Sequence, residues 1–182
     1  NTQLLWFRTS VAEEAGIDPT SGDVTWDDLI DAAEATGTRI GVQARRYEGY
    51  MVWINALVSS AGGTIVEHAD RGADATPTMA SPAGDEAADV VDRLSHSSAR
   101  PADLTTAGEE EARSLFHGPN GGFMVNWPYV YAAAKGEVDS GALDPPVEEP
   151  PPVGSGDRLY LNLGPASDGR PRFRESAAHA GV

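Results

Sequence analysis

The sequence predicts one domain of the α/β class, in which a layered sheet has mixed or parallel strands. Its 182 residues match the usual size of a single domain, and 40% of them are hydrophobic, which is enough for a buried core. Strand-like segments alternate with helix-like segments along most of the chain. This alternation is typical of layered α/β folds.

The first half of the chain begins with a predicted strand at residues 2–8, which are apolar and aromatic. A stretch rich in Gly, Pro and Asp follows up to Val24. Thr25 is a good N-cap with Asp28 in a capping-box position, and apolar residues then recur at helical spacing up to Gly37. The next predicted elements are a strand at 39–44, a polar corner at 45–49, a helix ended by Gly62 and Gly63, and a short strand at 64–67.

The second half contains three predicted helices and one strand. Ser81 is an N-cap, and Pro82 occupies the preferred first position of the helix that follows. Residues 109–116 form a short helix with acidic residues in its first turn, which the helix dipole favours. Residues 121–126 read as a strand, and Pro128 opens the last helix. We therefore expect a folded domain over residues 1–143, followed at 144–182 by a proline-rich segment and a poorly structured tail.

The charge and the absence of cysteine exclude several functions. The chain carries 13 Lys and Arg against 28 Asp and Glu, for a net charge of −15. Such a chain repels phosphate backbones, so nucleic acid is not an expected partner. A chain without Cys has no disulfide scaffold, no thiol catalysis and no Cys-ligated zinc. The longest uncharged run, 49–66, contains polar residues and a helix stop, so we expect no membrane insertion.

The sequence also lacks the common catalytic and cofactor motifs. It has no phosphate-binding loop, no complete dinucleotide fingerprint, no G-x-S-x-G and no H-E-x-x-H. The four histidines are scattered, and solvated surface histidine is a better account of each than metal ligation. We therefore expect no cofactor, no metal site and no catalytic residue.

The polar loops that follow strands are the remaining candidates for a site, because ligands of α/β folds bind outside the carboxyl ends of strands. Trp127 follows a strand directly and precedes a proline, so its ring is held on a short corner. An aromatic face beside carboxylates and amides suits a sugar. The alternatives are that Trp127 fills a gap in the core and that Glu109 only serves the helix dipole.

Four stretches resemble one family, the sugar-binding proteins of ABC importers of the maltose and trehalose type. The similarity is strongest to the actinobacterial trehalose-binding lipoproteins and covers about residues 1–134. The four stretches are NTQLLWFR at 1–8, TWDDL at 25–29, Tyr47-Glu48-Gly49 with Trp53 and Ala61-Gly62-Gly63, and Phe116 with Val125-Asn126-Trp127-Pro128.

The resemblance implies one lobe of the two-lobed periplasmic-binding-protein fold of type II, with helices on both faces of its sheet. The matched region is similar to the second lobe, so we expect the first lobe to lie outside this sequence. The family implies an extracellular, lipid-anchored receptor that binds an oligosaccharide of the trehalose or maltose type and delivers it to an ABC permease. It implies neither catalysis nor a cofactor.

The same resemblance assigns five ligand-binding residues: Asn1, Glu109, Trp127, Tyr47 and Glu48. Asn1 could instead be a frayed terminus, and Tyr47 and Glu48 could serve only to pack their loop. The rival from another class is a fragment of a glycoside hydrolase that uses Glu109 or Glu48 as its acid or nucleophile, which requires a second carboxylate at about 5–10 Å. A third alternative is an interaction domain without a ligand.

Overall fold

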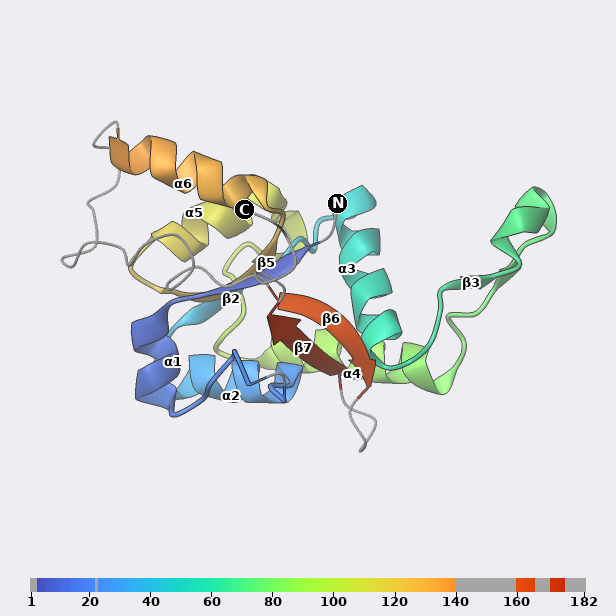
Figure 1. The fold of residues 1–182 in the computed structure, drawn as a ribbon, viewed down its shortest axis with the longest axis horizontal. Helices are drawn as coiled ribbons and strands as arrows, with labels where there is room; N and C mark the ends of the chain where they lie inside the picture. The colour runs from blue at the N-terminus through green and yellow to red at the C-terminus, as the bar shows by residue number, and fades with distance from the viewer. Residues whose placement is uncertain (1–2, 22, 140–159, 166–170, 176–182) are drawn as a thin grey trace.

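A three-stranded mixed sheet forms the centre of the computed structural model, which describes residues 3–21, 23–139, 160–165 and 171–175 (Figure 1). Strand β5 (Gly121–Asn126) is central, with β1 (Leu4–Phe7) antiparallel on one side and β2 (Arg39–Gly41) parallel on the other. Leu4 pairs with Asn126. The start of β1 and the ends of β2 and β5 therefore meet at one edge, which confirms the predicted α/β class with mixed strands.

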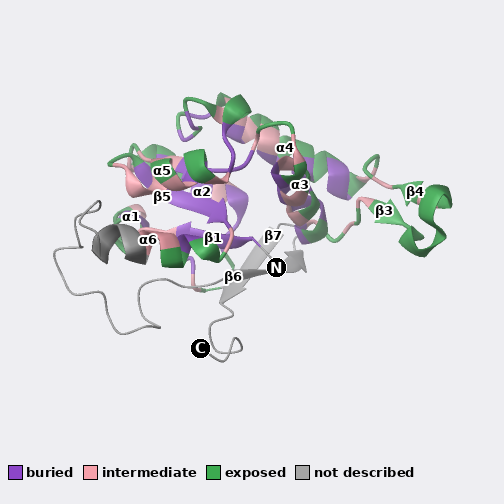
Figure 2. Ribbon diagram, turned by 90° about the horizontal axis from the view of Figure 1, so that it is seen from above, coloured by how far each residue is buried: buried purple, intermediate pink, exposed green. Residues whose placement is uncertain are grey.

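Helices cover both faces of this sheet because the strand residues are apolar on both sides. All six residues of β5 are buried (Figure 2). Phe123 and Val125 belong to the larger core, while Met124 belongs to a smaller core on the opposite face. The larger core includes residues of α2 (Trp26–Ala35), α3 (Glu48–Ser60) and α4 (Pro82–His96), and the smaller one includes residues of α5 (Glu109–His117) and α6 (Tyr129–Asp139).

Local capping signals place the starts of α2 and α4 where the sequence predicts them. The Thr25 hydroxyl accepts a bond from the Asp28 amide at 3.2 Å, and the Asp28 carboxylate accepts one from the Thr25 amide at 2.8 Å. Ser81 caps α4 by accepting a bond from the Gly84 amide at 3.3 Å, with Pro82 as the first helical residue. Each cap satisfies amide groups that a helix start leaves without partners.

Helix α1 (Thr9–Ala15) lies in the stretch up to Val24, for which the sequence predicted no element. Val11 and Ala12 are buried against the body, and the helix ends at Gly16 in the left-handed region (φ 70°). Seven residues are too few for a clear helical period in the sequence, so tertiary packing decides this element.

The predicted strand at 64–67 exists but does not belong to the main sheet. Strand β3 (Val66–Glu67) pairs with β4 (Thr76–Pro77) across a short 3₁₀ segment, η1 (Ala69–Asp74). All of these residues are exposed or half-exposed, and the two-stranded ribbon projects away from the body (Figure 2).

Helix α5 is fixed to β1 at its C-terminal end. One nitrogen of Arg8 donates to the carbonyls of Phe116, His117 and Gly118, at 2.9, 3.2 and 3.0 Å. These carbonyls have no partner within the helix, so the positive guanidinium satisfies them and complements the helix dipole. The opposite end of α5, at Glu109, is thereby positioned at the sheet edge where β5 ends.

Two further strands are described, β6 (Tyr160–Pro165) and β7 (Pro171–Glu175), which pair with each other in an antiparallel manner. Strand β6 also contacts β1 and α3. The predicted boundary between residues 143 and 144 lies outside the described residues and stays a prediction. Within the described ranges, no helix combines the length and the apolar composition needed to cross a bilayer.

Candidate functional site

The candidate site lies at the sheet edge where β2 and β5 end. The segment after β2 is joined there to the segment before α5, because the amides of Ala44 and Arg45 both donate to the carbonyl of Ala107, at 3.1 and 3.0 Å. On the other side, the Trp6 indole donates to the carbonyl of Asn126 at 3.3 Å. Topology therefore gathers three segments that are distant in sequence.

Asn126 links two of the predicted site residues. Its side-chain amide donates to the backbone carbonyl of Glu109 at 2.9 Å, and its side-chain oxygen accepts a bond from the Trp127 amide at 2.8 Å. Asn126 is completely buried. A buried amide with both ends bonded fixes its neighbours, so Asn126 sets the position of Glu109 relative to Trp127. Asn126 is not among the site residues predicted from the sequence, although a polar residue that ends an apolar strand is a usable signal.

Tyr47 lies beside Glu109. Burial is the main reason that the pKa of the Tyr47 phenol is raised, and the Glu109 carboxylate raises it further. The Arg45 guanidinium, 4.5 Å from the centre of the Tyr47 ring, partly opposes this rise. The hydroxyl also packs against Gly49, where any side chain would collide with it. Tyr47 is therefore neutral and firmly placed.

The three acids that begin α5 have different surroundings. The Glu110 carboxylate accepts bonds from Tyr129 at 2.6 Å and from Arg113 at 2.7 Å, and these contacts lower its pKa. Glu111 turns back to accept the Gly108 amide at 2.8 Å, which lowers its pKa. Glu109 forms no ion pair within the part of the chain that the structure describes, and it is a half-buried residue beside Tyr47.

Trp127 occupies the corner between β5 and α6. It is half-buried, and neither hydrophobic core of the described residues includes it. Its carbonyl accepts a bond from the Val130 amide at 3.2 Å, at the start of α6. This placement favours an accessible aromatic ring over a residue that fills a gap in the core.

The two other predicted site residues are placed less closely. Glu48 is the first residue of α3 and is exposed. Asn1 lies outside the described residues. Gln3, at the start of the same segment, donates to Gln43 at 2.5 Å, and Gln43 donates to the carbonyl of Val125 at 2.7 Å. This buried chain of amides ties the beginning of β1 to the same sheet edge.

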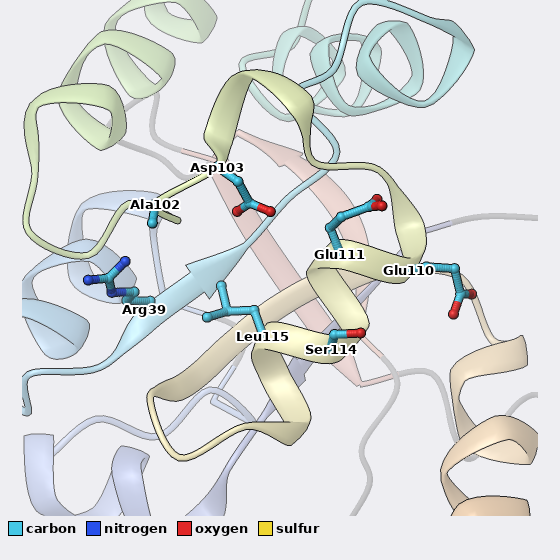
Figure 3. Close-up of a pocket in the computed structure, with 7 residues that line it drawn as sticks. All are labelled: Arg39, Ala102, Asp103, Glu110, Glu111, Ser114 and Leu115. Atoms are coloured by element: carbon cyan, nitrogen blue, oxygen red, sulfur yellow. The ribbon is translucent and has the colours of Figure 1, made fainter.

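An open hollow of about 500 Å³ lies beside the other face of α5 (Figure 3). Its volume is that of many small-molecule sites, but Glu110 and Glu111 in its lining already serve contacts within α5 and with α6. Glu109 lies on the opposite side of the helix from these residues, by the helical period. We therefore keep the hollow separate from the candidate site. The lining residues are Arg39, Ala102, Asp103, Glu110, Glu111, Ser114 and Leu115.

The candidate site contains aromatic, amide and charged groups but no evident metal centre. Among the described residues, no group of three His, Asp or Glu side chains lies close enough together to hold a metal ion. Stacking on Trp127 and hydrogen bonding by Glu109 are the interactions that this arrangement can provide, since the Tyr47 hydroxyl is buried.

Sequence comparison shows what the chain is similar to. A family model described as bacterial extracellular solute-binding protein matches residues 1–160. A protein of Deinococcus radiodurans, described as a probable ABC transporter-binding protein, is 32% identical over 148 residues. That match covers 74% of this chain and 33% of the relative, so the chain spans about a third of the relative's length.

Solved structures share the fold of this chain at low sequence identity. Maltose-bound MalE3 of T. maritima superposes with a TM-score of 0.66 at 22% identity, covering 96% of this chain and 43% of its own. A sugar transporter protein of Arthrobacter chlorophenolicus A6 with bound laminaribiose gives 0.61 at 10% identity, covering 96% and 41%. A solute-binding protein of Agrobacterium vitis S4 with bound D-mannitol gives 0.63 at 15% identity, covering 97% and 41%. These likenesses establish the type II fold of periplasmic binding proteins.

Proposed function

Because this chain belongs to the family of bacterial extracellular solute-binding proteins, we propose that it forms one wall of a sugar site in the receptor of an ABC-type importer. The observation that carries the proposal is the buried Asn126, which bonds to the backbone of both Glu109 and Trp127. A charged acceptor and a flat aromatic ring are thereby held together at the edge where α/β folds bind ligands.

In this proposal, Trp127 stacks on the apolar face of a sugar ring, and Glu109 accepts hydrogen bonds from its hydroxyls. Tyr47 contributes its ring to the site, because its hydroxyl is buried against Gly49. Both kinds of contact are common in carbohydrate recognition by proteins, since a sugar presents C–H faces and hydroxyl edges together. The site binds without catalysis, and Glu48 and Asn1 are additional contacts at its rim.

The remaining parts of the proposal concern the whole protein. We infer that this chain corresponds to the second of two lobes, and that closure of the two lobes on the sugar removes water from the site. The ligand is an oligosaccharide of the maltose or trehalose type. The sequence resemblance supports this class, and so does the bound maltose in a solved structure with the same fold. The loaded receptor, extracellular and lipid-anchored, then delivers the sugar to a membrane permease.

Replacement of Trp127 tests this proposal. In the full-length parent protein, Trp127→Ala should weaken sugar binding by about 1–3 kcal/mol, the scale of a lost aromatic contact in a binding site. Calorimetry with trehalose, maltose and glucose measures the effect. Tyr131→Ala is a matched control, because Tyr131 is an aromatic residue on α6 with 42% of its surface exposed. A Trp127→Ala protein that is equally stable and binds normally would remove Trp127 from the site.

A further inference from the structure

Arg45 is an exposed cation at the rim of the candidate site, in a chain where acids outnumber bases by 28 to 13. Its backbone amide is fixed to the carbonyl of Ala107 at 3.0 Å. Its guanidinium lies over the Tyr47 ring, with 4.5 Å between the Cζ atom and the ring centre. One of its terminal nitrogens also approaches Gly108, at 3.1 Å from the place that a Cβ atom would take. The planar group is therefore held between two partners.

The guanidinium helps to lower the pKa of the nearby Glu111 carboxylate, but it is not held in an ion pair with any described residue. Arg45 forms no salt bridge within the described ranges, although Glu109 and Glu111 flank Gly108. The Glu111 carboxylate is occupied by the Gly108 amide. An arginine carries five N–H donors in a fixed plane, so most of the hydrogen-bonding capacity of Arg45 faces solvent or a ligand.

The dipole of α5 does not favour a cation at the location of Arg45. It lies against Gly108, the residue that caps the N-terminal end of α5. Cations stabilise helix C-termini, while the N-terminal end favours anions. The helix dipole therefore does not account for an arginine at this place. Arg45 attracts the Glu111 carboxylate, and its remaining donors are available to a ligand.

The charges at this rim fit a neutral ligand. Arg45 supplies donors and Glu109 supplies an acceptor, and both lie beside the neutral Tyr47, whose hydroxyl is buried. Sugar hydroxyls both donate and accept hydrogen bonds, so a donor and an acceptor side by side match neighbouring hydroxyls of one ring. An anionic sugar would meet Glu109 and the net charge of −15.

We propose that Arg45 is a specificity-determining residue of the sugar site, and that its guanidinium donates paired hydrogen bonds to neighbouring hydroxyls of a neutral sugar. Tyr47 is the positioning residue that holds the guanidinium flat. One face of the Tyr47 ring is thereby covered by Arg45 and does not stack on the ligand. This inference rests on the proposed function and names the ligand class of the same site.

The test uses the full-length parent and four proteins: wild type, Arg45→Gln, Arg45→Lys and Arg46→Gln. Arg46 is the matched control, since it is an exposed arginine one position along the same loop. Calorimetry measures trehalose, maltose and glucose as neutral probes and glucuronic acid as an anionic probe. Thermal unfolding measures stability in parallel.

We expect Arg45→Gln to weaken binding of the preferred neutral sugar by about tenfold to a hundredfold, the effect of losing charge-assisted hydrogen bonds. Arg45→Lys should retain only a small part of the affinity that Arg45→Gln loses, because lysine keeps the charge but lacks the planar pair of donors. Arg46→Gln should bind like wild type, and the melting temperatures of all four should agree.

Each other outcome has a definite meaning. Normal sugar binding by a stable Arg45→Gln protein would overturn the role of Arg45 and leave the proposed function standing. Wild-type sugar affinity in Arg45→Lys would overturn the paired hydrogen bonds. Tighter binding of glucuronic acid than of any neutral sugar would overturn the ligand class. A wild-type parent that binds none of the probes would contradict the proposed function itself, and this inference with it.

Discussion

The acids at the start of α5 show how adjacent residues of one type acquire different roles. Glu110 and Glu111 are drawn into contacts within α5 and with α6, and the pKa of each carboxylate is lowered accordingly. Glu109 is turned toward Tyr47 on the other side of the helix. A run of three glutamates reads as one feature in the sequence, but the helical period points its members in different directions.

Glu109→Gln in the full-length parent should therefore reduce sugar affinity more than thermal stability. A charged acceptor contributes about 1.5–3 kcal/mol to binding, while an acid at a helix start gives about 0.3–1 kcal/mol to stability. Calorimetry and thermal unfolding measure the two quantities. Glu110→Gln is the matched control, and it should lower stability with little change in affinity. Unchanged affinity together with a lowered melting temperature for Glu109→Gln would show that Glu109 serves the helix dipole only.

Tyr47 gives a prediction about alkaline pH. Burial and the Glu109 carboxylate raise the pKa of Tyr47 above its ordinary value of 10 in the folded state. The stability that this neutral phenol contributes is fully present below about pH 10 and is lost as the pH rises further, because the unfolded chain ionises first. Tyr47→Phe removes the ionisable group. Its free energy of unfolding, measured with urea from about pH 8 to 11, should therefore fall less steeply than that of the parent.

Tyr129→Phe is the matched comparison for this experiment. The pKa of Tyr129 is also raised, by burial and by its bond to Glu110. The free energy of unfolding of this variant should therefore also fall less steeply at alkaline pH than that of the parent. Identical pH profiles for Tyr47→Phe and the parent would contradict the placement of Tyr47 beside Glu109.

At the scale of elements, Gly121 marks a close approach of β5 to α5. A Cβ atom there would lie 2.5 Å from the Leu115 carbonyl oxygen and from the Phe116 Cα atom. Gly121→Ala should therefore force the two elements apart and lower the free energy of unfolding by about 1–3 kcal/mol. Urea unfolding measures the change. Gly118→Ala is the control, since its Cβ would meet the nearest carbonyls at 3.3 Å. Equal stability of the two variants would contradict this packing.

Elements with local signals could be predicted from the sequence, while their partners could not. The Thr25 cap, the Ser81–Pro82 start and the strand 121–126 all depend on residues a few positions apart, and the structure confirms each. The pairing of β3 with β4 could not be predicted, because neither strand carries a local signal that identifies the other. Helix α1 forms through burial of two residues on the body and was therefore missed.

The candidate site follows the same division. The sequence identified Tyr47, Glu109 and Trp127 as candidates, and the fold gathers their three segments at one sheet edge, with Tyr47 beside Glu109. Asn126 could not be assigned as their link without knowing that α5 returns to the end of β5. The stacking of Arg45 on Tyr47 likewise depends on side-chain geometry that sequence spacing does not show.

At the scale of the whole molecule, the proposed function gives this chain one wall of the site. The chain spans 33% of its curated relative and 41–43% of the solved structures described above. Small-molecule sites usually bury about 70–90% of their ligand, which one rim of side chains cannot achieve. Hydrogen bonds to a sugar also gain strength when a second wall excludes water. The proposed function therefore requires the remainder of the parent protein.

The most direct test of the central claim is calorimetry of this 182-residue chain and of its full-length parent, side by side, against trehalose, maltose and glucose. We predict that the parent binds at least one of these sugars at micromolar concentration, while the isolated chain binds none more tightly than about millimolar. Micromolar binding by the isolated chain as a monomer would contradict the single-wall account, and a parent that binds no sugar at all would contradict the assignment of a sugar receptor.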